Sequence, residues 1–411
     1  MTSSPPSPSH SPSSTARPGW KFVTFVGVLT ALGAITTDIY LPSLPEVAAD
    51  LHTTEALAGS TISIVLMGAA VGTLLVGALS DRLGRRRAAL MGISLHVLAS
   101  IGAGFAGSIE MLLALRFLQG FGNATANVSA MAIVRDRFTG AAAAAVLSRL
   151  MLVIGVVPLL APSLGAIIAA AGGWRLVFFF IAAYGALLLV AVGFVLPETL
   201  APEHRSRNVK ETWDGYRILL RDSQFRLLAL LPGLSFGAML AYVVASTFVV
   251  QVELGLDKAQ FSIFFAAMGT GMILFAQFNA YLVRRVDSLN LLRGGTTFAF
   301  ASSLVLLTVV LSGNRNLWVL GACIWLVLAG FAFIGPNATT LALANHGERA
   351  GRGAALIHSL QALVAAPISA SVGFLGGDSR AMALVMAASF GLALAVVLLG
   401  VRRCPPRAVL P

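Results

Sequence analysis

The stretch KFVTFVGVLTALGAITTDIYLPS, residues 21–43, decides how this chain must fold. It is mainly a run of apolar and small residues, and as a helix it is long enough to cross the ~30 Å hydrocarbon core of a bilayer. One carboxylate, Asp38, lies inside this run, and a charge at that depth costs at least ~2.5–3.5 kcal/mol. Such a residue is typically kept because it carries a proton or holds a substrate.

The rest of the chain has the same apolar character. Of its 411 residues, 57% are hydrophobic and only 11% are charged, whereas soluble proteins carry roughly 25% charged residues. Because the loops are short, the backbone must satisfy its hydrogen bonds within helices. We therefore predict an all-α membrane protein with twelve transmembrane helices, over residues 21–43, 57–79, 88–107, 111–133, 146–171, 174–196, 227–250, 260–282, 294–312, 316–341, 354–376 and 380–401.

The distribution of positive charge predicts the orientation of these helices. With the N-terminus inside, 23 of the 28 Lys and Arg residues fall on the cytoplasmic side, four fall outside, and Arg116 lies within a span. This asymmetry follows the positive-inside rule and places both termini in the cytoplasm, with the chain in the cytoplasmic (inner) membrane. The net charge of +11 therefore indicates topology and contact with an anionic inner leaflet, not nucleic-acid binding.

A polar central loop, residues 198–225, divides the chain into two six-helix halves, 20–197 and 226–401. Within it, residues 210–220 are equally consistent with an amphipathic surface helix and with a plain linker. The loop after the second span, 77–87, has a basic counterpart after the eighth span, which indicates an internal repeat. Such repeats place a substrate site between the halves, near the midplane. The ends of the chain, residues 1–19 and 402–411, are predicted to be cytoplasmic tails, the first of them Ser/Pro-rich and disordered.

The loop GALSDRLGRRR, residues 77–87, is the most specific local motif. Its glycines permit close helix approach and a tight turn, and Asp81 can face a helix N-terminus or pair with an arginine. A plain positive-inside loop would explain the arginines but not the order Gly-x-x-x-Asp-Arg-x-Gly-Arg-Arg. We expect Asp81, Arg82 and Arg85 to hold the two halves together at the cytoplasmic face when the cavity opens outward. The expected gating residues of this loop are Gly77, Asp81, Arg82, Gly84 and Arg85.

That order resembles the cytoplasmic loop signature of the major facilitator superfamily. TDIYLPSLP (37–45) is similar to the first-helix motif of the Bcr/CflA drug exporters, which confer bicyclomycin and chloramphenicol resistance, and LRFLQG (115–120) is similar to their fourth span. APSLG (161–165) followed by GWR (173–175) resembles the antiporter motif, although Ala161 and Ala166 stand where the wider family has glycine. The resemblance covers nearly the whole chain beyond the N-terminal tail. It implies a proton-driven multidrug antiporter of the major facilitator fold.

Asp38 and Arg116 are the two charges expected inside the membrane. Asp38 lies about five residues from the outer end of its span and Arg116 about five to eight, which is ~8 and ~8–12 Å of helix rise. Burial favours a neutral carboxyl group and a nearby cation favours the charged form, so a shared cavity would keep a carboxyl titratable near neutral pH. We predict that both residues couple transport to protons. The alternative is a buried structural ion pair.

Polar residues of the fourth span lie on one helical face. Their spacing is that of one side of an α-helix, and they are Arg116, Gln119, Asn123 and Asn127. Such a polar stripe is consistent with the wall of a cavity or with hydrogen bonds between helices. In the fifth span, Gly165 and two prolines favour a helix that bends during transport. The expected substrate cavity consists of Thr37, Tyr40, Gln119, Asn123, Asn127, Pro158 and Pro162.

The sequence predicts a transporter rather than an enzyme. It contains no phosphate-binding loop, no metal-ligand spacing and no nucleophile–base set, so no cofactor or metal is expected. We predict a monomeric, proton-coupled secondary active exporter of small lipophilic drugs that works by alternating access. One alternative is a proton-linked transporter of a specific metabolite, an amino acid or a sugar, although a sugar carrier is expected to need more polar and aromatic side chains. The other is a non-transporting membrane sensor, for which no loop is long enough to form a domain.

Overall fold

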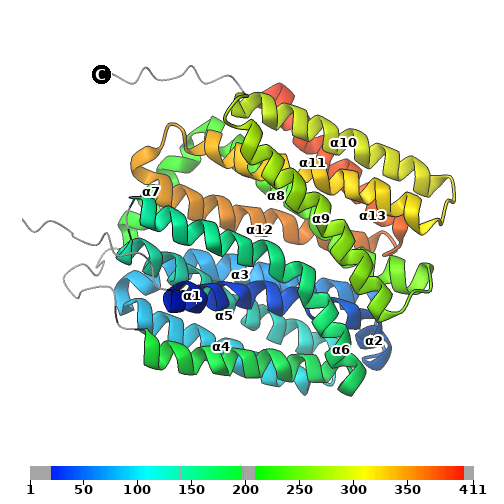
Figure 1. The fold of residues 1–411 in the computed structure, drawn as a ribbon, viewed down its shortest axis with the longest axis horizontal. Coiled ribbons are helices and arrows are strands. Elements are labelled where there is room, and N and C mark those ends of the chain that lie inside the picture. Colours follow the sequence, from blue (N-terminus) through cyan, green and yellow to red (C-terminus); the bar gives the residue numbers. More distant parts are fainter. Residues whose placement is uncertain (1–19, 139, 197, 199–208, 402–411) are drawn as a thin grey trace, which may run out of the picture.

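The computed structural model describes residues 20–138, 140–196, 198 and 209–401, and within these residues all regular structure is helical (Figure 1). A 3₁₀ turn, η1 (Leu41–Ser43), follows the first helix, a π-helical turn, η3 (Val249–Glu253), follows α8, and a second 3₁₀ turn, η4 (Gly347–Arg349), precedes α12. The helices are α1 (Trp20–Asp38), α2 (Leu44–Asp50), α3 (Glu55–Leu83), α4 (Arg85–Gly104), α5 (Ile109–Arg137), α6 (Gly140–Val195), α7 (Val209–Arg221), α8 (Ser223–Phe248), α9 (Lys258–Leu282), α10 (Ser288–Leu311), α11 (Leu317–Leu343), α12 (Ala350–Phe374) and α13 (Ser379–Gly400).

Ten segments of the described chain are long and apolar enough to cross a membrane. The segment that contains the fourth predicted span, α5, is a helix of 29 residues but is too polar to count among the ten. The fifth and sixth predicted spans are joined in α6. This helix is interrupted at Gly172 and Gly173, whose φ/ψ angles of −160°/25° and 70°/−176° are not helical. The all-helical, apolar character predicted from the sequence is thus confirmed.

Two local features differ from the sequence prediction or refine it. The first predicted span continues to residue 43, but α1 ends at Asp38. Prolines explain the early end: Pro42 lies in the 3₁₀ turn η1 and Pro45 in the first turn of α2, and a proline has no backbone N–H to continue a preceding helix. In the central loop, α7 occupies Val209–Arg221, which corresponds to the helical alternative for this segment.

The helices form two groups, α1–α6 and α8–α13, which lie one above the other in Figure 1. Two polar contacts join the groups toward the end that carries α2, opposite α7. The hydroxyl oxygens of Ser63 and Ser369 are 2.7 Å apart and join α3 to α12. Glu46 and Lys258 form an ion pair of 2.5 Å between α2 and α9. The two groups are therefore closed against each other at this end.

Glycines bring α3 and α5 into backbone contact. A Cβ atom at Gly120 would lie 1.9 Å from the carbonyl oxygen of Val65, and one at Gly68 would lie 2.1 Å from that of Phe117. No side chain fits at either position. Close approach of this kind is how small residues let membrane helices pack. It sets the position of α5, which carries the buried polar residues described below.

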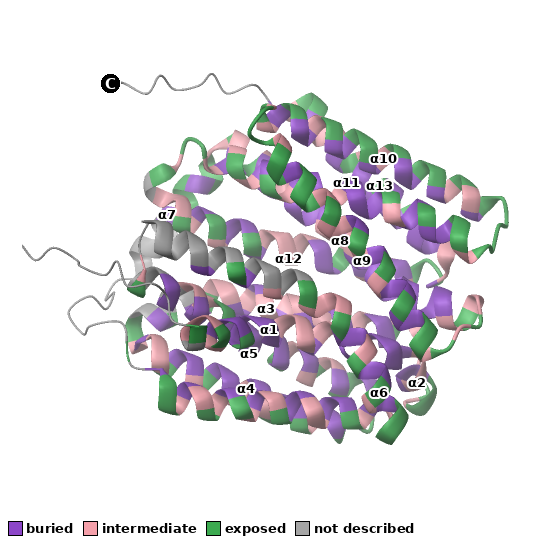
Figure 2. Cartoon of the chain, viewed as in Figure 1, coloured by how far each residue is buried: buried purple, intermediate pink, exposed green. Residues whose placement is uncertain are grey.

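The outer surface of the bundle is apolar. Figure 2 shows that many helices have a buried side toward their neighbours and an exposed side away from them. The exposed sides carry large hydrophobic residues, and Phe194, Phe374 and Leu399 are 88–89% exposed. An apolar surface of this extent is unsuited to water and suits contact with lipid.

Candidate functional site

Asp38 is the last residue of α1 and lies on a half-buried face of it. Ala34 and Thr37 share this partial burial, whereas Thr36 is fully buried. The final turns of α1 therefore have two different sides. One, which carries Thr36, is fully buried, and the other, which carries Asp38, is half-buried.

Arg116 lies on the packed side and is fully buried within the group α1–α6. Its Nη1 atom donates to the carbonyl oxygen of Thr36 at 3.0 Å and to Oε1 of Gln119 at 2.7 Å. Its Nε atom donates to the carbonyl oxygen of Thr61 at 3.4 Å. Arg116 thus connects α5 with α1 and α3 through backbone carbonyl groups.

Arg116 and Asp38 do not form the ion pair that was one alternative from the sequence. Among the described residues, no carboxylate lies within 4 Å of the Arg116 guanidinium, the distance that defines an ion pair. The reason is geometric: Thr36, whose carbonyl group Arg116 binds, and Asp38 are two residues apart and lie on roughly opposite sides of a helix with 3.6 residues per turn. Arg116 instead binds a carbonyl group in the last turn of α1, where a cation is favourable. Arg116 therefore binds the backbone of the turn that carries Asp38 and not the Asp38 carboxylate.

Aromatic rings enclose the Arg116 guanidinium. Its Cζ atom lies 4.9 Å from the centre of the Tyr40 ring and 5.6 Å from that of Phe178, and the two ring centres are 5.0 Å apart. Such cation–π contacts favour a charged guanidinium away from water. The Tyr40 hydroxyl and the Arg116 Nη2 atom are buried and have no hydrogen-bond partner among the described residues.

A buried polar chain continues from Arg116 into α4. The Nε2 atom of Gln119 donates to Oγ of Ser100 at 2.7 Å, and this hydroxyl donates to the carbonyl oxygen of His96 at 2.6 Å. The Nδ1 atom of His96 lies 3.4 Å from the carbonyl oxygen of Gln119. The sequence prediction missed His96 and Ser100. The signal that would have found them is their spacing of four residues, which places both on one face of an otherwise apolar span.

The other polar residues predicted on α5 differ in environment. Asn123 is buried, and its Oδ1 atom accepts a hydrogen bond of 3.5 Å from the hydroxyl group of Thr36. Asn127, one turn further, is exposed. Gln119 and Asn123 thus bond between helices in this conformation, and neither lies on the wall of a described pocket.

The predicted residues of α6 approach the end of α1. Pro158 is half-buried and Pro162 is buried within the helix. A Cβ atom at Gly165 would lie 1.7 Å from the carbonyl oxygen of Ile39, the residue after Asp38. Gly165 therefore lets the backbones of α6 and α1 touch beside the carboxylate.

The loop between α3 and α4 contains the turn predicted at Gly84, whose φ angle of +98° suits glycine. The backbone N–H of Arg85 donates to Oε1 of Glu198 at 2.8 Å, which ties the loop to the segment after α6. Arg82 is exposed. The surroundings of the two other residues predicted in this motif, Gly77 and Asp81, lie outside what the structure describes.

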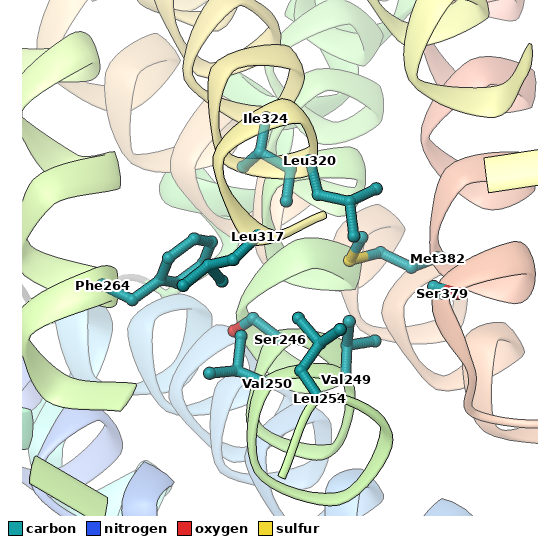
Figure 3. A pocket seen from close by; sticks show the side chains of 10 residues that line it. All are labelled: Ser246, Val249, Val250, Leu254, Phe264, Leu317, Leu320, Ile324, Ser379 and Met382. Carbon is teal, nitrogen blue, oxygen red and sulfur yellow. The ribbon is translucent and has the colours of Figure 1, made fainter. Parts of the chain in front are cut away.

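Two small pockets stand out in the described part of the chain, and both lie away from Asp38. Figure 3 shows the first, an apolar space with room for about one water molecule. The second, of similar size, lies between the two helix groups, against α3, α8 and α12. Neither approaches the ~300 Å³ of a ligand site. The first pocket is lined by Ser246, Val249, Val250, Leu254, Phe264, Leu317, Leu320, Ile324, Ser379 and Met382.

These observations define a multi-pass membrane protein built from two groups of helices, with a fully buried arginine and a half-buried aspartate at the end of its first helix. The family model of the Major Facilitator Superfamily matches residues 26–370. The chain belongs to this superfamily and is a transporter rather than an enzyme.

Individual relatives narrow the branch. The chain is 32% identical to an uncharacterized MFS-type transporter, YdgK, of Bacillus subtilis, over 89% of this chain and 90% of that protein. It is 29% identical to a bicyclomycin resistance protein homolog of Haemophilus influenzae, over 88% and 90% of the two chains. The resemblance to the Bcr/CflA branch is thus confirmed.

A solved structure confirms the fold. The partially occluded, inward-open conformation of the xylose transporter XylE from E. coli has a TM-score of 0.71 to this chain at 14% identity, and the match covers 93% of this chain and 98% of that one. At this identity the likeness concerns the fold alone.

Proposed function

We propose that this protein is a proton-coupled exporter of small lipophilic drugs that works by alternating access in the cytoplasmic membrane. The observation that carries the proposal is the arrangement at the end of α1. Asp38 lies on the half-buried side of the last turn, and Arg116 holds that turn from the other side. The resistance named in the relative from H. influenzae supports drugs as substrates.

The proposed membrane arrangement has twelve spans. It counts α5 as a span and divides α6 at Gly172 and Gly173 into two. Six helices then lie in residues 20–197 and six in 226–401, with the central loop 198–225 and both termini in the cytoplasm. The positive-inside distribution of Lys and Arg supports this orientation. We propose that the transporter is a monomer.

In this orientation, α2 and the ion pair between Glu46 and Lys258 lie at the outer face. The contacts described between the halves then close the outer end, which corresponds to an inward-facing state. We propose that Asp81, Arg82 and Arg85 join the halves at the cytoplasmic face only in the opposite, outward-facing state.

In the proposed mechanism Asp38 exchanges protons with water between the halves. A carboxylate against lipid would cost at least ~2.5–3.5 kcal/mol, so we propose that the half-buried face of α1 borders a water-filled space. A proton taken up from outside favours one orientation of the halves, and its release inside accompanies uptake of the drug. The proposed substrate cavity consists of Thr37, Tyr40, Gln119, Asn123, Asn127, Pro158 and Pro162, several of which are buried in this conformation and reach the cavity when the helices rearrange.

The direct test of this function uses purified protein in proteoliposomes with an imposed pH gradient. We expect labelled chloramphenicol or bicyclomycin to accumulate against its concentration gradient toward the acidic side, and a protonophore to abolish the accumulation. A panel of amino acids and sugars serves as the comparison. Accumulation of a panel metabolite in place of the two drugs would favour the alternative of a metabolite transporter, and transport of neither class would contradict the proposal.

Substitutions of Arg116 test whether its shape or only its charge is required. Lysine keeps the charge but lacks the planar guanidinium. It can therefore donate to only some of the three acceptors that Arg116 binds. We expect Arg116→Lys to keep partial drug transport and Arg116→Ala almost none, as measured in proteoliposomes. Normal transport by Arg116→Ala would contradict a role in coupling.

The ion pair between Glu46 and Lys258 is expected to stabilise the closed outer end. Both side chains are about one-third exposed, so the pair contributes only ~0.2–1 kcal/mol. Either charge reversal, Glu46→Lys or Lys258→Glu, should raise the ratio of open to closed outer ends by up to about fivefold. The double reversal should restore closure. The measurement is the rate of disulfide formation in a protein with Ser63→Cys and Ser369→Cys, whose hydroxyl oxygens are 2.7 Å apart in the closed state.

A control for this experiment is the bond between Arg175 and Asp50, which lies at the same end but within the N-terminal half. Arg175→Ala should leave the rate of disulfide formation unchanged. If this substitution lowers the rate as much as the charge reversals do, the effect is a general loosening of the outer end and not the loss of a contact between the halves.

A further inference from the structure

The directions of the hydrogen bonds from Arg116 through Gln119 to Ser100 follow from the chemistry of these groups. A guanidinium group can only donate hydrogen bonds, so the atom of Gln119 that lies 2.7 Å from Arg116 must be its carbonyl oxygen. The NH₂ group of Gln119 then points to Ser100, whose oxygen accepts at 2.7 Å. We assign the single proton of the Ser100 hydroxyl to the carbonyl oxygen of His96 at 2.6 Å, because the other acceptor, the Nε2 atom of His96, is farther away at 3.5 Å. The orientation of the Gln119 amide, which a structure usually leaves open, is thus fixed by the guanidinium group of Arg116.

This arrangement makes the position of Arg116 depend on Ser100. Arg116, Gln119 and Ser100 are all fully buried, so water is not at hand to replace a lost partner. Without the Ser100 oxygen, the NH₂ group of Gln119 would be a buried donor with no acceptor, which is costly. Rotation of the amide would relieve this cost but would turn NH₂ toward the guanidinium and remove one of its acceptors.

Few charged or titratable groups face this chain. Among the described residues they are Tyr40, from the segment after α1, and His96, from α4. The helices α3 and α6 contribute the carbonyl group of Thr61 and the ring of Phe178, which do not titrate. The geometry of Arg116 is therefore set mainly by its hydrogen bonds and by these two rings.

We propose that Ser100 is a positioning residue for proton coupling: through the Gln119 amide it keeps Arg116 bound to the last turn of α1, away from the Asp38 carboxylate. The proposal rests on the coupling role proposed above for Asp38 and Arg116. It assigns a function to α4, a helix in which the sequence shows no charged residue beyond its first turn. When the Ser100 hydroxyl is removed, the Arg116 guanidinium is less firmly held and is attracted toward the Asp38 carboxylate. Its positive charge then makes the charged form of Asp38 more favourable.

The experiment measures protonation of Asp38 without any drug. A hydrophobic carbodiimide reacts with protonated carboxyl groups, and mass spectrometry of the peptide that contains Asp38 gives the labelled fraction at each pH. We expect the pH of half-maximal labelling to fall by about one unit in Ser100→Ala. Ser100→Thr keeps the hydroxyl group and should restore the value of the unaltered protein. A merely structural serine would change the melting temperature but not this pH.

Two further variants make the test specific. Gln119→Leu should lower the pH of half-maximal labelling like Ser100→Ala, and adding Ser100→Ala to it should cause no additional change, since both act through one amide. The control is Ser303→Ala, because Ser303 is equally buried but bonds only the carbonyl group of Phe300 on its own helix. An unchanged pH in Ser100→Ala, or an equal fall in Ser303→Ala, would overturn the proposal while leaving the exporter function intact. If labelling in the unaltered protein does not depend on pH, both this proposal and the coupling role of Asp38 are wrong.

Discussion

We expect Asp38→Asn to abolish uphill drug export while the protein still folds and inserts into the membrane. Asparagine has nearly the same shape but cannot release a proton, so the drug can no longer be driven by the pH gradient. Folding should be preserved because Asp38 forms no ion pair with any described residue and lies on the half-buried side of α1. The substitution therefore removes a charge without leaving a buried cation unpaired.

Two measurements on one preparation separate coupling from binding. Proton release on addition of drug to the purified protein should vanish in Asp38→Asn, whereas exchange of labelled for unlabelled drug without a pH gradient should continue. The control is Glu110→Gln, the same type of change at an exposed position of α5, which should behave like the unaltered protein. If proton release and uphill transport both persist in Asp38→Asn, the carboxylate does not couple transport to protons.

The second large effect is expected at Gly165, where even one methyl group should stop transport. The added Cβ atom would lie 1.7 Å from the carbonyl oxygen of Ile39, and contacts below 3.0 Å are essentially never observed. Because the contact is with backbone, α1 and α6 must separate by about 1 Å or more, directly beside Asp38. A displacement of this size can cost a factor of ~100 in activity, and overpacking typically costs ~1–3 kcal/mol of stability.

The same helix offers a matched control. Gly193 also lies on α6, but a Cβ atom there would meet no heavy atom within 4 Å. Alanine favours a helix over glycine by ~1 kcal/mol, so Gly193→Ala should be neutral or slightly stabilising, whereas Gly165→Ala should lower both the melting temperature and the transport rate. Equal behaviour of the two variants would show that the contact between Gly165 and Ile39 does not control the position of α1.

The overall fold was predictable because it depends on composition. A chain with 57% hydrophobic and 11% charged residues must satisfy its backbone within helices in a membrane, and each predicted span lies within or largely overlaps a described helix. The turn at Gly84 was predictable for a similarly local reason, since glycine readily adopts a positive φ angle. The superfamily and its branch followed from short ordered motifs, and the comparisons confirmed both.

The arrangement of the site depended on information that a linear pattern does not contain. Depth along a helix follows from residue count, so the sequence could place Asp38 and Arg116 near the same level. It could not give the side of α1 from which each group is approached, and there the structure separates the two charges. The ion pair between Glu46 and Lys258 was equally hidden, because 212 residues separate its members and α2 carries no strong sequence signal.

The sequence by itself determined that this protein is a helical membrane transporter and which two charged residues lie in the apolar stretches 21–43 and 111–133, because hydrophobicity and charge act on each segment independently of the others. Only the tertiary structure decided that Arg116 binds the backbone of α1 instead of Asp38, and that Ser100 orients Gln119. These are contacts between helices. Their geometry is set by how closely backbones approach at residues such as Gly120 and Gly165, and by which way each helix is turned about its axis.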